Sequence, residues 1–241
     1  MRLLLCAATG RELAALAPAV PGFAESLPEM RTVPVPAGSL KGHVEASLCV
    51  TGVGPINAAC AAGMALGQAA AEGRQFDAVL CAGLAGAYAL ETRPLRSLCH
   101  VYEEIWPEYG LHDGISVTAG AFRFPLWQKT EQEAIRDRLP LADVKSLGDC
   151  PRAKDFIPCR SLTVAGVSAS ANRVRDLWNR YHAELENMEG FAVAYACARV
   201  GIPCVEIRSV SNKAGPRARE EKDFPGALAA LENILPALNL L

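Results

Sequence analysis

The chain has 241 residues, and its 24 basic and 26 acidic side chains give a formal net charge of −2 at neutral pH. Hydrophobic residues make up 51% and charged residues 21%, a balance that excludes intrinsic disorder and offers no basic surface for nucleic acid or an anionic membrane. A chain of this length buries a sizeable core without disulfides or metals, and we expect a single domain over residues 1–241.

Short apolar runs alternate with longer helical stretches along the chain. The apolar runs predict strands at Leu3–Ala8, Val33–Pro36, His43–Thr51, Asp77–Cys81, Ser97–Ile105, Leu162–Val167 and Pro203–Val210. Helical patterns occupy Glu12–Leu16, Ile56–Ala71, Asn187–Val200 and Phe224–Leu238. The polar stretch Tyr109–Pro158 is expected to form loops around one edge. Strands separated by helices, several of them buried on both faces, predict a three-layer α/β/α sandwich with a mixed, mostly parallel central sheet.

The sequence also bears on the cell compartment and on cofactors. The apolar run Leu3–Ala8 is shorter than the core of a signal peptide, and no run approaches the roughly 18 apolar residues of a membrane helix. Nine cysteines include no CxxC pair, and most lie in apolar runs, which favours a reducing, cytoplasmic location. Four histidines without an HExxH motif or a His/Cys cluster predict no metal site, and we expect no cofactor.

Small or polar residues follow four of the predicted strands, at the edge where open α/β sheets bind ligands. They are Thr9-Gly10, Gly52–Pro55, Gly83–Gly86 and Ser209–Asn212. None matches GxGxxG or GxxxxGK[ST], so neither a dinucleotide site nor a Walker-type phosphate site is predicted. Glu189 opens an apolar helix and Asn212 ends the last strand. Taken alone, Glu189 can simply complement the helix dipole and Asn212 can simply cap a turn.

Together these motifs resemble those of the nucleoside phosphorylase and nucleosidase superfamily. The segment ENMEGFAVA…GIP…RSVSN is similar to the MEGAAVA…GIP…R.ISD signature, TGVGPINAA to the SGIGKVNAA element, and CAGLAGAY to the GTAGGL strand and turn. Glu12 stands in the place of the glutamate of the nucleosidases' GAMxxE motif. Within the superfamily, ENMEG, GLAGAY and the final SN resemble the futalosine hydrolases, whereas adenine-specific nucleosidases carry Asp at the position of Asn212. Two positions depart from these patterns: residues 104–110 read EIWPEYG instead of ExFADxG, and Ala169 replaces a base-stacking aromatic residue.

The resemblance implies hydrolysis of the N-glycosidic bond of a nucleoside by water, in a homodimer. For the futalosine hydrolases it implies release of hypoxanthine and dehypoxanthine futalosine in the menaquinone pathway. It assigns activation of water to Glu12 and the ribose hydroxyls to Glu189, whose charge favours the cationic transition state. The Asn212 amide donates and accepts at once, so it can serve O6 and N7 of a 6-oxopurine. Further substrate contacts are expected from Met188, Gly54, Ala85, Gly86, Ser168 and Arg217.

Three other functions remain open at this point. A methylthioadenosine/adenosylhomocysteine-type nucleosidase would use the same two glutamates. A purine nucleoside phosphorylase requires a cationic phosphate pocket, yet the strand before Gly83 contains no arginine and Arg11 is a lone candidate. A nucleoside-binding protein without catalysis would have lost its catalytic carboxylates, whereas Glu12 and Glu189 are both retained.

Overall fold

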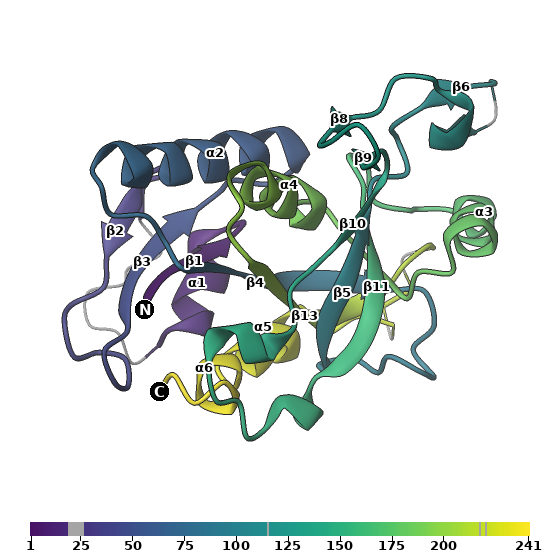
Figure 1. Cartoon of the computed structure of the whole chain (residues 1–241). Coiled ribbons are helices and arrows are strands. Elements are labelled where there is room, and N and C mark those ends of the chain that lie inside the picture. Colours follow the sequence, from purple (N-terminus) through teal and green to yellow (C-terminus); the bar gives the residue numbers. More distant parts are fainter. Residues whose placement is uncertain (19–26, 115, 217, 220) are drawn as a thin grey trace.

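The computed structural model describes residues 1–18, 27–114, 116–216, 218–219 and 221–241 (Figure 1). Among these residues, nine strands form one mixed sheet in the order β10-β5-β11-β12-β4-β1-β3-β2, and β13 pairs with both β4 and β5. The strands are β1 (Arg2–Ala7), β2 (Thr32–Pro34), β3 (Glu45–Val50), β4 (Ala78–Ala87), β5 (Leu98–Ile105), β10 (Arg138–Pro140), β11 (Ile157–Thr163), β12 (Leu185–Asn187) and β13 (Cys204–Lys213).

Parallel pairings predominate in this sheet, which confirms the predicted mixed, mostly parallel architecture. In the described part of the chain, β1 runs parallel to β3 and β4, β11 to β5 and β12, and β13 to β4. The other four pairings are antiparallel. Because β13 joins β4 to β5, the strands β4, β13, β5, β11 and β12 close into a ring. The sequence pattern did not predict this closure.

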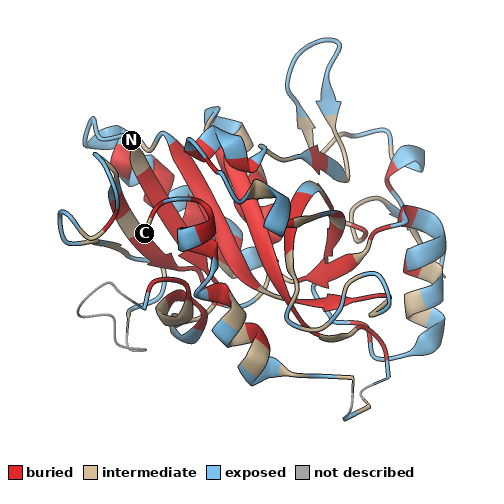
Figure 2. Cartoon of the chain, turned by 90° about the horizontal axis from the view of Figure 1, so that it is seen from below, coloured by how far each residue is buried: buried red, intermediate tan, exposed pale blue. Residues whose placement is uncertain are grey.

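Helices cover both faces of the sheet around β1 (Figure 1). Successive side chains of a strand point to opposite faces. Leu3 and Leu5 accordingly pack with α1 (Gly10–Leu16), α5 (Phe224–Leu231) and α6 (Ile234–Ala237). Leu4 and Cys6 pack on the other face with α2 (Pro55–Ala71) and α4 (Gly190–Val200). The central strands are therefore buried throughout, as Figure 2 shows, and this is why their sequences are continuously apolar.

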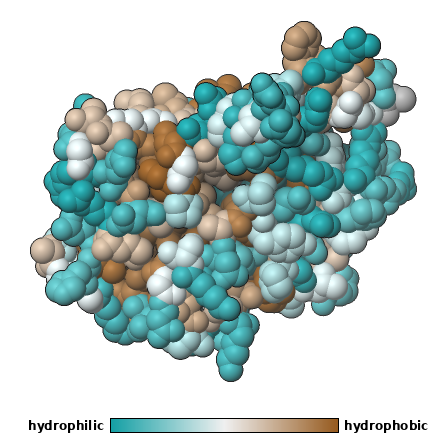
Figure 3. All heavy atoms as spheres, in the orientation of Figure 1, coloured by the Kyte–Doolittle hydropathy of each residue, from teal (hydrophilic) through white to brown (hydrophobic). Residues whose placement is uncertain are grey.

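The surface is largely hydrophilic on the face drawn in Figure 3, where apolar atoms show in small areas between polar ones. No helix among the described residues is both long and apolar enough to cross a bilayer.

Several predicted boundaries are wrong in informative ways. The strand β4 continues through Gly83–Gly86, which we had predicted as a turn. Asn187 ends β12 instead of opening a helix, and α4 begins at Gly190. The terminal helix breaks into α5 and α6, and the strand predicted at Leu162–Val167 lies earlier, as β11.

The polar stretch 109–158 contains short elements rather than loops alone. They are β6 (Leu111–His112), β7 (Val117–Thr118), β8 (Trp127–Gln128), β9 (Ala134–Ile135), β10 and three 3₁₀ turns. The pattern also missed the helix α3 (Ala171–Tyr181), which Ser170 caps by accepting from the Arg173 N–H.

Candidate active site

Glu12 is held at the carboxyl end of β1 by the start of α1. Thr9 and Glu12 form a capping box: the Thr9 hydroxyl accepts from the Glu12 N–H, and Glu12 Oε2 accepts from the Thr9 N–H at 3.0 Å and from the Thr9 hydroxyl at 2.8 Å. Glu12 Oε1 accepts from the Leu84 N–H of β4 at 2.9 Å. These contacts fix a buried carboxylate across two neighbouring strands.

Glu189 approaches the same place from the start of α4. Its Oε1 accepts from the Gly54 N–H at 3.1 Å, and its Oε2 lies 3.4 Å from Arg208 Nη1. Burial raises the pKa of the Glu189 carboxyl above its usual value, although Arg208 and the Gly54 N–H oppose the shift. Three residues that the sequence predicted separately, Glu12, Gly54 and Glu189, are thus brought together.

Arg208 of β13 is the residue of this cluster to which the sequence analysis gave no role. Its side chain is 1% exposed; Nε donates to Glu206 Oε1 at 2.8 Å and Nη2 donates to Asn187 Oδ1 at 3.1 Å. Burial works against the charged form, yet the carboxylates, Glu206 foremost, raise the pKa of Arg208 well above its usual value. The available signal was the arginine of the R.ISD signature.

Glycine at position 83 is required for this convergence. A Cβ on Gly83 would lie 2.9 Å from both Arg208 Nη1 and Glu12 Oε1. Any side chain there would therefore displace the guanidinium or the carboxylate. The GLAG element thus lets Arg208 and Glu12 meet over β4, without forming a turn.

A buried polar layer supports Arg208 and Glu189 from inside the ring of strands. Asn187 Nδ2 donates to Glu104 Oε1 at 2.6 Å, while its Oδ1 accepts from the backbone N–H groups of Glu189 and Gly190. Asn187 therefore caps α4 and fixes where Glu189 points. Burial, reinforced by the neighbouring Glu206 carboxylate, raises the pKa of Glu104 well above its usual value.

A cavity of about 320 Å³, here called the Asn212 cavity, lies beside this cluster. Four of the predicted substrate-contact residues line it: Gly86, Ser168, Met188 and Asn212. Met188 directly precedes Glu189 and Gly86 follows Gly83 along β4, so the backbone joins the cavity to the Glu12–Glu189 cluster. Its other lining residues are Val167, Glu186, Lys213, Gly215, Ala218, Glu221, Lys222 and Phe224.

The orientation of the Asn212 amide is fixed by its neighbours in the chain. Nδ2 donates to the Lys213 carbonyl at 2.8 Å, and Oδ1 accepts from the Ser211 hydroxyl at 2.9 Å. Reversing the amide would place its oxygen against the Lys213 carbonyl. One N–H and one oxygen lone pair remain for a ligand.

One further predicted residue is placed differently. Ala85 is buried, and its carbonyl accepts from the Ser211 hydroxyl at 3.2 Å, so it supports the end of β13 and does not line the Asn212 cavity. Arg217 lies outside the described residues. Among the described residues, no group of three or more His, Cys, Asp or Glu side chains could hold a metal ion.

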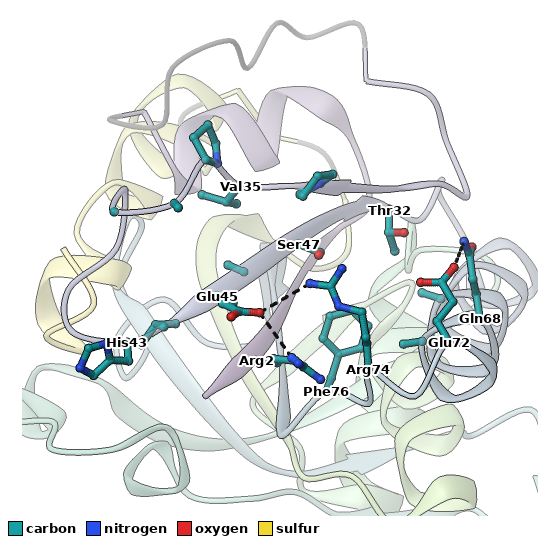
Figure 4. Close-up of a pocket in the computed structure, with 18 of the residues that line it drawn as sticks. Arg2, Thr32, Val35, His43, Glu45, Ser47, Gln68, Glu72, Arg74 and Phe76 are labelled. Atoms are coloured by element: carbon teal, nitrogen blue, oxygen red, sulfur yellow. Dashed lines mark hydrogen bonds and ion pairs between the residues drawn. The ribbon is translucent and has the colours of Figure 1, made fainter.

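A larger cavity, about 560 Å³, lies between β2, β3 and α2 (Figure 4). Glu45 pairs there with Arg2 at 3.4 Å and with Arg74 at 3.6 Å, and these side chains are largely exposed. It lies at the amino ends of β1 and β4, whereas ligands of open α/β sheets bind at the carboxyl ends. None of the predicted site residues lines it.

Comparisons with known proteins agree with this geometry. The model of the phosphorylase superfamily matches residues 2–237. A futalosine hydrolase of Streptomyces coelicolor is 33% identical over 244 residues, covering 99% of this chain and 95% of the relative. A futalosine hydrolase of Thermus thermophilus is 35% identical over 181 residues, covering 75% of each chain.

Solved structures show the same fold at lower identity. A futalosine hydrolase mutant of Helicobacter pylori superposes with a TM-score of 0.70 at 18% identity, covering 99% of this chain and 98% of that one. A 5'-methylthioadenosine/S-adenosylhomocysteine nucleosidase of the same species gives a TM-score of 0.72 at 18% identity, covering 99% and 97%.

Proposed function

Because the chain belongs to the phosphorylase superfamily and, within it, to the futalosine hydrolase family, we propose that it hydrolyses the N-glycosidic bond of futalosine and releases hypoxanthine. The observation that carries this proposal is the meeting of Glu12, Glu189 and Arg208 over Gly83, beside the Asn212 cavity. Release of hypoxanthine would place the reaction in the menaquinone pathway, as the resemblance implies.

The two glutamates have different roles at the sugar: Glu12 binds the attacking water and Glu189 binds the ribose hydroxyls. Glu12 accepts three hydrogen bonds from the protein, which leaves one of its roughly four acceptor sites for a water molecule. Glu189 accepts from Gly54 and takes the ribose hydroxyls with its remaining acceptor sites. Both carboxylates also stabilise the positive charge that develops on the sugar as the bond breaks.

The surroundings of Arg208 support water over phosphate as the nucleophile. Its guanidinium is buried and already contacts Glu189, Glu206 and Asn187, so its donors are engaged within the protein. A phosphate ion entering beside Glu12 and Glu189 would meet two carboxylates without a free cation from Arg208.

The fixed Asn212 amide supports choice of a 6-oxopurine. With Nδ2 aimed by the Lys213 carbonyl, the remaining N–H can donate to O6 while Oδ1 accepts from a protonated N7. A 6-amino group would instead place two donors against each other. One unsatisfied buried donor costs about 1–3 kcal/mol, so we expect roughly tenfold to hundredfold preference for futalosine over its 6-amino counterpart.

Base release by the purified protein in phosphate-free buffer tests this function. We expect hypoxanthine to be released from futalosine at a rate that added phosphate does not raise, as measured by chromatography. Adenine should be released more slowly from the 6-amino counterpart. Prolonged EDTA treatment should leave the rate unchanged. Strict dependence on phosphate would indicate a phosphorylase, and preference for the amino substrate would indicate an adenine-type nucleosidase. Binding of hypoxanthine without turnover would indicate a nucleoside-binding protein.

We also infer a homodimer that forms through α2. This helix exposes an uncharged stripe at helical spacing: Ile56, Ala59, Cys60, Gly63, Met64 and Gly67. Ile56 is 84% exposed and Met64 54%. Ile56 follows closely on Gly54, which contacts Glu189, so a partner on this stripe would lie near the site. Light scattering should show a dimer that Met64→Lys shifts towards monomer. Lys154→Met, at an exposed position in a 3₁₀ turn outside α2, should leave the dimer intact.

The remaining expectations from the sequence stay predictions. They are the cytoplasmic location, the single domain, and the absence of cofactor, nucleic-acid and membrane partners.

A further inference from the structure

Glu186 is a buried carboxylate in the Asn212 cavity that the reaction described above does not use. It is 3% exposed and lies on β12, three residues before Glu189. Its Oε1 accepts from the Ser168 N–H at 2.9 Å, and its Oε2 accepts from the hydroxyls of Ser168 at 2.6 Å and Tyr88 at 2.9 Å. Burial raises the pKa of Tyr88, so its hydroxyl keeps the proton that it donates.

All the donors that reach Glu186 from the described residues are neutral. No lysine or arginine in the described part of the chain forms an ion pair with it. An ionised carboxylate accepts about four hydrogen bonds, and Oε1 has accepted one. A buried carboxylate without a cation needs its acceptor sites filled. A lone pair of Oε1 is therefore left for a donor from the cavity.

The sheet places this carboxylate opposite Asn212. Glu186 pairs with Gly86 in the β12–β4 ladder, and Gly86 pairs with Asn212 in the β4–β13 ladder. A Cβ on Gly86 would lie 3.2 Å from Asn212 Nδ2 and 3.5 Å from Glu186 Cγ. Gly86 thus leaves an open strip of backbone with an amide on one side and a carboxylate on the other.

We propose that Glu186 reads the purine base by accepting a hydrogen bond from N1–H of a 6-oxopurine, while Asn212 contacts O6 and N7 of the same base. This inference rests on the proposed function, since it takes hypoxanthine to be the leaving group. N1 of a 6-oxopurine carries a hydrogen, whereas N1 of a 6-aminopurine presents a lone pair. The same carboxylate therefore attracts the first base and repels the second, which makes Glu186 a specificity-determining residue.

Glu186→Gln separates base reading from a structural role. With its amide nitrogen in the place of Oε1, the glutamine keeps an acceptor oxygen for the Ser168 and Tyr88 hydroxyls and offers an N–H to N1 of an aminopurine. We expect kcat/KM for futalosine to fall and kcat/KM for its 6-amino counterpart to hold or rise, so that their ratio changes by about tenfold or more. A carboxylate that only holds Ser168 and Tyr88 in place would lower both values by the same factor.

Tyr88→Phe is the matched control. It removes one donor to Glu186 and leaves the acceptor facing the cavity unchanged, so both substrates should be affected equally. If Glu186→Gln behaves like Tyr88→Phe, with a constant ratio, the inference is wrong while futalosine hydrolysis by the wild type still stands.

Calorimetric binding of free bases gives a readout that does not depend on turnover. Wild-type protein should bind hypoxanthine at least tenfold more tightly than 1-methylhypoxanthine, which lacks the N1 hydrogen, and Glu186→Gln should narrow this gap. If that holds in a protein that leaves futalosine intact, the proposed function fails and the base-reading role survives. Equal binding of the two bases by the wild type overturns the inference, even if Glu186→Gln fails to fold.

Discussion

Glu186 and Glu189 lie three residues apart and are both buried, yet their surroundings differ. Glu189 lies beside Arg208, which also engages Glu206 and Asn187, so its carboxylate has a buried cation as a partner within the protein. Glu186 has neutral donors and an open acceptor site at the Asn212 cavity. The comparison separates a first region, whose carboxylates share a buried cation, from a second region, whose carboxylate has only neutral partners within the protein. Changes in the first should affect folding and catalysis, and changes in the second should affect base choice.

The largest effect is expected from removing Arg208, the cation of the first region. Arg208→Met leaves buried carboxylates without their shared partner, which typically costs about 3–5 kcal/mol of folding free energy. Urea unfolding followed by circular dichroism would measure it. Arg138→Met, which breaks an exposed pair with Glu103, should cost no more than about 1 kcal/mol. A similar cost for both variants would mean that the buried carboxylates do not depend on Arg208 for their stability.

Loss of either site glutamate should reduce turnover strongly while preserving the fold. We expect Glu12→Gln and Glu189→Gln each to lower kcat by about 10²-fold or more, the usual scale for acid–base and electrostatic groups. Initial rates of hypoxanthine release measure this. Exposed Glu232 provides the control, since Glu232→Gln should keep the wild-type rate. Near-normal turnover in folded Glu189→Gln would refute its place at the ribose.

Replacing the Asn212 amide with a carboxylate tests the second region most directly. Asn212→Asp places a carboxylate oxygen against the Lys213 carbonyl and removes the donor for O6. The preference for futalosine over its 6-amino counterpart should narrow or reverse, by roughly tenfold to hundredfold in the ratio of kcat/KM. An unchanged ratio would show that Asn212 does not contact the base.

The two raised carboxyl pKa values predict pH effects that are confined to the first region. Because burial raises the pKa of Glu189, the acidic limb of kcat/KM should lie above the usual titration range of a glutamate. Glu104 also has a raised folded pKa, so its contribution to stability is present below the unfolded pKa and is lost as pH rises through the folded one.

Replacing Glu104 tests that sign directly. Glu104→Gln removes the titration, so the free energy of unfolding of the wild type should fall relative to this variant as pH rises from the acidic side. Urea unfolding between about pH 4 and 8 measures the difference, and Glu232→Gln should follow the wild type. A difference that does not vary with pH would contradict the raised pKa.

The sequence was informative where local chemistry repeats a known pattern. Thr9 and Glu12 form a capping box three residues apart, and the helix that starts after Glu189 has one charged residue, Arg199. The position of Glu189 at the start of a helix was evident from the apolar pattern, whereas Glu12 was assigned from the resemblance to the GAMxxE motif. The mixed sheet was likewise evident from apolar runs that are buried on both faces.

Other features depend on contacts between distant strands, which periodicity cannot reveal. Arg208 reads as an ordinary arginine in a strand until β4 brings Glu12 to it across Gly83. Glu186 directly precedes the predicted helix Asn187–Val200 and was given no role, but as part of β12 it alternates with Asn187, so the two side chains point to opposite faces. The helix α3 was missed because its surface is charged and only Leu177 and Tyr181 are buried among its described side chains.

The turn between β12 and α4, here called the Asn187 corner, has a consequence for how this site can change during evolution. A single amide fixes the start of α4, with Glu186 just before it and Glu189 just after. Any shift of this corner would move the sugar-side and base-side carboxylates together, so a new nucleobase preference cannot arise from backbone movement without loss of catalysis. A change in base preference therefore requires side-chain replacements at positions 186 and 212. We expect those two positions to vary as a pair among proteins that keep Asn187.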